Sequence, residues 1–330
     1  MRSLHQHSLK GSKPGSAKPK RSKQLHLYVL GFTALAAFST LAGYEASRFN
    51  GGTPWGNGNL VLAASFSEAP ATAPGVANPE LADLGLLAPQ DQAQQLLERA
   101  IRRDAESLEM INKNVDGWRG HLENTDHLFD LLHTALNSDD LRVRGAAVEI
   151  DLAANNLSKS SESVSRLVQR LHDNPADRPW TLWRLGALGN RGVQPEVVLA
   201  QLLTYTRDRN EETRYWAVEG LAVLGTDAAI DPLLDRFAHD PSPRVRKRAA
   251  CNLAAAGLLT KEQRLAAVPQ LLNFFDDDAL DSTTRGWVYG ALRLITGAEI
   301  GNDADAWRIW WAKRDTTQKQ THSHTNLLFA

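Results

Sequence analysis

The chain has 330 residues, of which 37 are Lys or Arg and 38 are Asp or Glu, with 42% hydrophobic residues and one cysteine. The hydrophobic content is ordinary for a globular protein and too low for a polytopic membrane protein. The single Cys251 excludes an intramolecular disulfide framework and any zinc site built from several cysteines. The formal net charge of −1 lacks the basic excess that is typical of nucleic-acid-binding proteins.

The N-terminal segment predicts a membrane anchor. Residues 1–24 contain seven Lys or Arg and no acid, and residues 25–44 are an apolar run without Asp, Glu, Lys or Arg. A helix of about 20 apolar residues crosses the hydrocarbon core of a bilayer, and flanking basic residues stay on the cytoplasmic side. We therefore predict a cytoplasmic tail at 1–24, a single-pass anchor at 25–44 in the plasma (inner) membrane, and an exported remainder, which is periplasmic if the organism is bacterial.

A cleaved signal peptide is the alternative for the same segment, because it has the same order of charge and apolar core. Thr40-Leu41-Ala42 is an acceptable cleavage context, and both interpretations export the rest of the chain. Residues 45–90 are interrupted throughout by Gly and Pro, which predicts a disordered linker or stalk. Residues 315–330 are mainly polar and predict a flexible tail.

An internal repeat dominates residues 91–314. Five segments of similar sequence begin with an arginine, and the spacings between successive arginines are 34, 36, 32 and 39 residues. These arginines are Arg144, Arg178, Arg214, Arg246 and Arg285. Leu, Ala and Val recur at helical spacing, and no convincing strand pattern is present. A period of this length predicts an all-α fold, an α-solenoid of about five stacked helix pairs.

Each copy predicts the same parts. First helices are expected at 125–137, 161–173, 195–207, 227–239 and 262–275. The second helix begins near the arginine and carries an apolar stripe, which in one copy is Thr213, Ala217, Leu221 and Leu224. A glycine that ends the second helix in the left-handed conformation is expected at Gly189, Gly225, Gly257 and Gly297.

The ends of the array should be covered, because a solenoid must shield its terminal apolar surfaces. Trp307, Trp310 and Trp311 lie on one face of a predicted helix that would cover the C-terminal end. An amphipathic helix at 91–113 would cover the opposite end.

Two copies carry an acid six residues before the arginine, Asp208…Arg214 and Asp240-Pro-Ser-Pro-Arg-Val-Arg246. In this respect the chain resembles HEAT-repeat proteins, and most of all the short HEAT-like repeats also found in phycobilisome lyases. The resemblance implies a ladder of hydrogen bonds between successive repeats at Asp208, Arg214, Asp240 and Arg246. The other three copies have Ser138, His172 and Ala279 in place of the acid, which leaves the ladder open there.

The chemistry-bearing residues form no catalytic pattern. His121, His127 and His133 are six residues apart and do not converge on one helix face. Asp276-Asp277-Asp278 lacks the glycine and glutamate of an EF-hand loop, and Cys251 lies in a predicted helix beside two alanines, as a packed thiol would. We therefore predict no catalytic residue, metal site or cofactor.

Tryptophan recurs at the second position after the arginine, at Trp180, Trp216 and Trp287. One interpretation is packing between adjacent second helices, and the other is an aromatic row on the concave surface. Because aromatic and arginine side chains dominate binding hot spots, Trp180, Arg184 and Trp216 are the predicted partner-binding surface.

We expect a membrane-anchored scaffold that binds a protein partner without catalysis. A lyase or isomerase of the phycobilisome-lyase type is the first alternative, and it would need a bilin pigment. A nucleic-acid-binding solenoid is the second alternative, and it is disfavoured because the chain after residue 24 has a net charge of −8. After residue 24, Lys and Arg are clustered at one place in the sequence, at Arg244, Arg246, Lys247 and Arg248.

Overall fold

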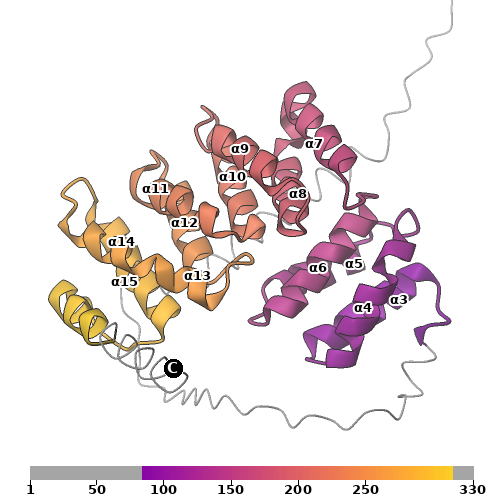
Figure 1. The fold of residues 1–330 in the computed structure, drawn as a ribbon, viewed down its shortest axis with the longest axis horizontal. Helices are drawn as coiled ribbons and strands as arrows, with labels where there is room; N and C mark the ends of the chain where they lie inside the picture. Colours follow the sequence, from indigo (N-terminus) through magenta and orange to yellow (C-terminus); the bar gives the residue numbers. More distant parts are fainter. Residues whose placement is uncertain (1–83, 315–330) are drawn as a thin grey trace, which may run out of the picture. The chain divides into compact units, whose positions relative to one another are not determined.

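The computed structural model describes residues 84–314, and within this range the chain forms α-helices and short 3-10 helices and no strand (Figure 1). The predicted anchor at 25–44 lies outside the described residues, as do the basic tail, most of the stalk and the C-terminal tail. None of the described helices combines the length and the apolar character that a membrane crossing requires.

Consecutive helices form pairs. The first five pairs are α3 (Pro89–Ile101) with α4 (Ala105–Trp118), α5 (Asp126–Leu136) with α6 (Leu141–Ala154), α7 (Ser161–Asp173) with α8 (Arg178–Asn190), α9 (Pro195–Tyr205) with α10 (Glu211–Leu224), and α11 (Ile230–His239) with α12 (Pro243–Ala254). In the sixth pair, α13 (Lys261–Ala266), α14 (Val268–Asn273) and the 3-10 turn Phe274–Asp276 precede α15 (Ser282–Thr296). The described residues thus contain six pairs where the repeat predicted about five.

The additional pair comes from the segment expected as a single helix at 91–113, and that expectation was wrong. The side chain of Asp104 accepts hydrogen bonds from the backbone N–H groups of Glu106 and Ser107 and begins α4. Arg103 before it has a φ of 70°, which a continuous helix does not allow. The capping aspartate therefore divides the segment into α3 and α4.

The predicted first helices lie where the sequence places them, except that the last is broken. Pro269 stands in the first turn of α14 and has no N–H to continue a hydrogen-bond ladder from α13. Except for α8, the second helices of the five copies begin at polar residues whose side chains accept backbone N–H groups. The capping residues are Asp140 for α6, Asn210 for α10, Ser242 for α12 and Asp281 for α15.

Three of the four expected glycine caps have the left-handed conformation, with φ of 60° at Gly225 and 71° at both Gly257 and Gly297. The expectation for Gly189 was wrong, because this residue lies inside α8. A Cβ atom there would lie 2.6 Å from a methyl carbon of Leu224, so Gly189 allows close packing of α8. After α8, Gly192 and Gln194 have the left-handed conformation, with φ of 79° and 46°.

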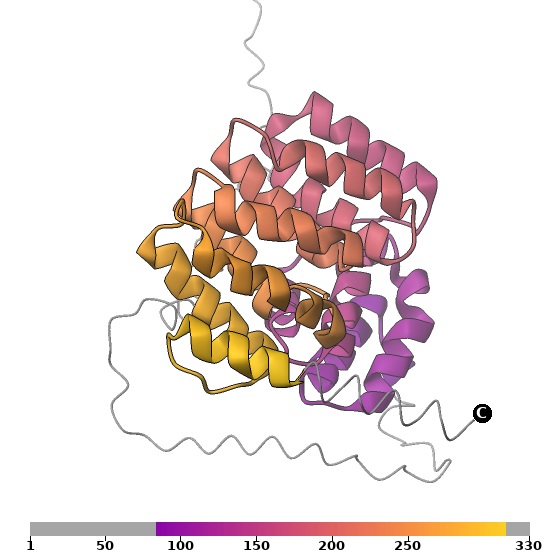
Figure 2. The same cartoon turned by 60° about the vertical axis from the view of Figure 1, so that its left-hand side comes forward.

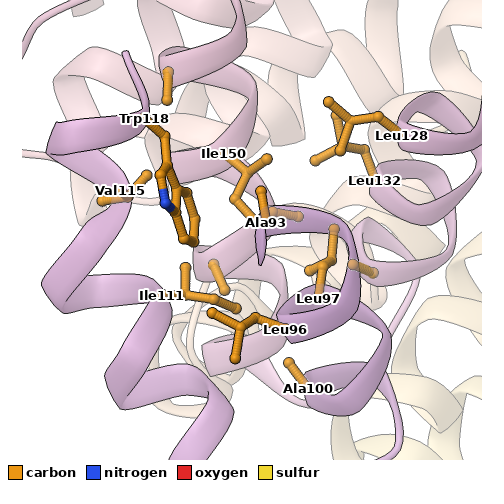
Figure 3. Packing of buried hydrophobic residues seen from close by; sticks show 14 of the residues in the cluster. Ala93, Leu96, Leu97, Ala100, Ile111, Val115, Trp118, Leu128, Leu132 and Ile150 are labelled. Carbon is orange, nitrogen blue, oxygen red and sulfur yellow. The ribbon is translucent and has the colours of Figure 1, made fainter. Parts of the chain in front are cut away.

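The hydrophobic core follows the predicted stripes. Thr213, Ala217, Leu221 and Leu224 are all buried on α10. The helices α3 to α6 share a cluster of their own that includes Leu96, Leu97, Ile111, Val115, Trp118 and Ile150 (Figure 3). The indole Nε1 of Trp118 in this cluster donates to Oε1 of Gln92 at 2.6 Å.

The second helices α8, α10, α12 and α15 contact one another in chain order (Figures 1 and 2). The closest contact is between α8 and α10, where a Cβ atom added to Gly186 would lie 2.2 Å from the carbonyl oxygen of Gly220. After α15 the residues 304–314 form a further helix, and its Trp307 is fully buried.

Candidate functional site

The arginine that heads each repeat closes the turn inside its own helix pair. In all five copies its guanidinium donates to a backbone carbonyl at or just after the end of the first helix. The donor and acceptor residues are Arg144 and Ser138, Arg178 and Leu171, Arg214 and Asp208, Arg246 and Asp240, and Arg285 and Asp277. A backbone carbonyl is present whatever the side chain, which explains why the arginine occurs in copies that lack the acid.

Three of these arginines also reach the next pair. Nε of Arg214 lies 2.9 Å from Oδ2 of Asp240, and its Nη2 lies 3.0 Å from Oδ1. Nη1 of Arg178 lies 3.4 Å from Oδ2 of Asp208. Nη2 of Arg246 lies 2.8 Å from Oδ2 of Asp281. The four predicted ladder residues thus belong to a series of three arginine–aspartate pairs, each of which joins one helix pair to the next.

The centre of the ladder is buried. Asp240 is 1% exposed and Arg214 is 7% exposed, and Oδ1 of Asp240 also accepts the N–H of Ser242 at 2.9 Å. The hydrogen bond that the Arg214 guanidinium donates to Asp240 raises the pKa of that guanidinium, although burial opposes this effect. The pair is therefore a charged bond between repeats that little water reaches.

The structure brings the three residues of the predicted partner surface together. The rings of Trp180 and Trp216 have centroids 5.2 Å apart, and Cζ of Arg184 lies 5.3 Å from the centroid of the Trp180 ring. Nε of Arg184 also lies 3.0 Å from Oδ2 of Asp151 on α6. Trp216 and Trp287 are buried, whereas Trp180 is partly exposed. Packing thus accounts for Trp216 and Trp287, whereas solvent reaches Trp180.

Further residues that the sequence did not assign to the partner-binding surface extend this group. Cζ of Arg244 on α12 lies 4.2 Å from the ring centroid of Tyr215, and its Nη1 lies 2.5 Å from Oε2 of Glu212. The indole Nε1 of Trp216 donates to Oε1 of Glu212 at 2.8 Å. We call Trp180, Arg184, Tyr215, Trp216 and Arg244 the aromatic–arginine cluster. Glu212 and Arg244 each lie near the start of a helix, and nothing in the sequence indicated that these two side chains would contact each other.

The surroundings shift the pKa of one residue in this cluster and of one residue beside it. Burial raises the pKa of Tyr215 to about 12. Although burial opposes it, the carboxylate of Glu219 holds the pKa of the Arg248 guanidinium above its usual value, and Nη2 of Arg248 lies 2.8 Å from Oε2 of Glu219. The phenol stays neutral and the guanidinium stays charged at ordinary pH.

The histidines and the acidic run Asp276-Asp277-Asp278 noted in the sequence do not form a common site in the described structure. Nε2 of His127 lies 3.4 Å from Oε1 of Glu98, and burial lowers the pKa of His133. Asp276 pairs with Arg308 at 2.7 Å, and Asp277 accepts the N–H of Ala279 at 2.9 Å. Within residues 84–314, no three His, Cys, Asp or Glu side chains are placed to hold a metal ion.

The comparison with family models identifies the repeat. Residues 164–254, which run from α7 to the end of α12, match the family described as HEAT repeats. Residues 164–254 are therefore HEAT repeats, and the resemblance noted in the sequence is confirmed for this part of the chain. A search of curated proteins and a search of solved structures each gave no significant match.

Proposed function

We propose that this protein is a non-catalytic scaffold that binds a protein partner through the aromatic–arginine cluster. Stacked helical repeats present an extended surface and serve widely as binding platforms. The observation that carries the proposal is the partly exposed Trp180, which is held in place by Arg184 and by the buried Trp216. A rigid aromatic side chain loses little entropy on binding and suits a hot spot.

Site-specific photo-crosslinking in intact cells tests this proposal. A photoreactive phenylalanine derivative replaces Trp180 in one variant and Gln169, an exposed residue of α7, in the control. We expect a discrete crosslinked protein from position 180 and none from position 169. Its yield should fall at least fivefold when Arg184→Ala is added, because Arg184 orients the ring beside it. Equal products from both positions, or no product from position 180, would contradict the proposal.

We also propose that residues 25–44 anchor the protein in the plasma membrane with the repeats on the exported side. The support is the sequence order of seven basic residues followed by an uncharged apolar run. Alkaline extraction of membranes, combined with protease added to cells whose outer barrier has been opened, tests both parts. The intact chain should stay in the membrane pellet and lose its repeats to the protease. Recovery of the intact chain in the soluble fraction would refute the anchor.

A further inference from the structure

The helices α3 to α6 have a core separate from the rest of the described chain. Their cluster includes Val143, Ala147 and Ile150 from α6 and extends no further than Ala154. Val148 and Leu152, on the same helix, are also buried but lie outside that cluster. We call residues 84–154 the N-terminal block. The core of the block thus lies among its own four helices.

The junction between the N-terminal block and α8 relies on long polar side chains. Arg184 pairs with Asp151 at 3.0 Å, Arg191 pairs with Glu149 at 3.0 Å, and Nη2 of Arg191 donates to the carbonyl oxygen of Gly145 at 2.9 Å. The junction between α8 and α10 differs, because there the backbones of two glycines meet directly. Flexible side chains tolerate a change of angle between helices better than a close backbone contact does.

Arg144 makes a second connection, to a helix far along the chain. Within the block its Nε donates to the carbonyl of Ser138. Its Nη1 donates to the carbonyl oxygens of Ala255 at 2.7 Å and Gly257 at 2.8 Å, just beyond the end of α12. Carbonyls at a helix C-terminus carry partial negative charge and lack partners in their own helix. Arg144 thus joins residues more than 110 positions apart in the sequence and contacts the turn that follows α12.

Arg144 shares this helix end with a second buried cation. The guanidinium of Arg264 donates to the carbonyls of Asn252, Leu253 and Ala256. Burial and the positive charge of Arg144 lower the pKa of Arg264 to about 10. The hydrogen bonds of Arg144 favour its contact with α12, whereas its burial and the repulsion from Arg264 oppose it. The contact therefore combines favourable hydrogen bonds with an unfavourable burial of charge.

We propose that the N-terminal block turns as a unit on the α6–α8 junction, and that Arg144 is the latch that holds it against α12. When the latch opens, the carbonyls of Ala255 and Gly257 become accessible to water, and α6 moves away from the end of α12. The ion pairs to α8 keep the block attached. This movement changes the spacing between α6 and the helices that carry the aromatic–arginine cluster.

Distance measurements between spin labels on the full chain test the latch. In a Cys251→Ser background, Asn137→Cys and Lys261→Cys place labels on either side of it, because Arg144 bonds to Ser138, which follows Asn137, and to Gly257, four residues before Lys261. We expect one narrow distance distribution with Arg144 present. Arg144→Met should shift the main peak to a longer distance and broaden it.

Arg142→Met is the matched control. Arg142 lies on the same helix, is exposed, and pairs with Asp140 in its own turn, so its loss should leave the distribution unchanged. If circular dichroism shows that Arg144→Met does not fold, Arg144→Lys replaces it, because one ammonium group cannot span the acceptors on both sides. A folded Arg144 variant with an unchanged distribution, an equal shift in Arg142→Met, or failure of both Arg144 variants to fold would overturn the proposal.

Discussion

The guanidinium of the repeat arginine bonds on two sides at once. In Arg214, Nη1 donates to a carbonyl of its own turn, while Nε and Nη2 form a forked pair with Asp240 of the next repeat. A planar group with five N–H donors can do this, whereas a lysine ammonium cannot offer the same fork. A single residue therefore orders the turn within one pair and joins that pair to the next.

Loss of the buried carboxylate should be costly. We expect Asp240→Asn to lower the free energy of unfolding by about 3–5 kcal/mol, because the nearly buried Arg214 loses its counter-charge. Asp139→Asn is the control, since Asp139 and its partner Arg103 are 77% and 71% exposed, and it should cost less than about 1 kcal/mol. Denaturant titration of both variants measures the difference. Equal, small losses would show that the ladder adds little stability.

The buried phenol of Tyr215 should make stability fall at high pH. Its pKa is about 12 in the folded protein, above its usual value of 10, so the folded state keeps the proton that the unfolded state releases. The stabilisation is thus complete below pH 10 and is lost as pH rises toward 12. At about pH 11.5 the wild type should have lost roughly 2 kcal/mol more than Tyr215→Phe. Parallel losses in the two proteins, measured by urea unfolding at pH 9 and 11.5, would contradict this assignment.

At the scale of elements, glycine sets the distance between α8 and α10. Gly186 and Gly220 face each other so closely that a Cβ atom on either would overlap a backbone oxygen of the other helix. The helices can approach to this distance only because no side chain separates them. The α8–α10 crossing is therefore the least tolerant contact among the described second helices.

Alanine at this crossing should force the two helices apart. We expect Gly186→Ala to lower the free energy of unfolding by about 1–3 kcal/mol or more, since the added methyl group has no space. Gly117→Ala on α4 is the control, because its Cβ would meet nothing within 4 Å, and alanine there should stabilise by up to about 1 kcal/mol. Thermal unfolding of both variants checks the opposite signs. A loss of similar size in Gly117→Ala would show that the packing argument fails.

Local sequence signals predicted most element positions, and packing decided the exceptions. The repeat and its capping residues indicated the five first helices, because their periodicity and turn chemistry agree. Gly189 could not be distinguished from a true cap, since its role depends on Leu224 of a different pair. The division at Asp104 was missed because the segment has no arginine-headed repeat to mark a second helix.

The same limit applied to the candidate site. Trp180, Arg184 and Trp216 could be proposed from their repeat position, and they do contact one another. Tyr215 with Arg244, and Arg144 with the end of α12, are contacts between different pairs. Their partners are set by the angles at which the pairs stack, and one repeat period does not specify those angles.

At the scale of the whole described chain, the structure is a series of helix pairs in which neighbours stabilise one another. Such an array has stability that is approximately a sum of terms for each pair and each interface. The separate core of α3 to α6 marks the place where this coupling changes character, because side chains rather than backbones make the contact there. Damage at one interface should consequently stay near that interface.

Hydrogen–deuterium exchange of the full chain with Asp240→Asn tests this account most directly. Asp240 joins α10 to the pair α11 and α12, so its loss weakens that interface first. We predict at least tenfold faster exchange of amides in α10, α11 and α12, with α3 and α4 unchanged from the wild type. A uniform increase from α3 to α15 would contradict the account, because it would mean that the described helices unfold as one indivisible core.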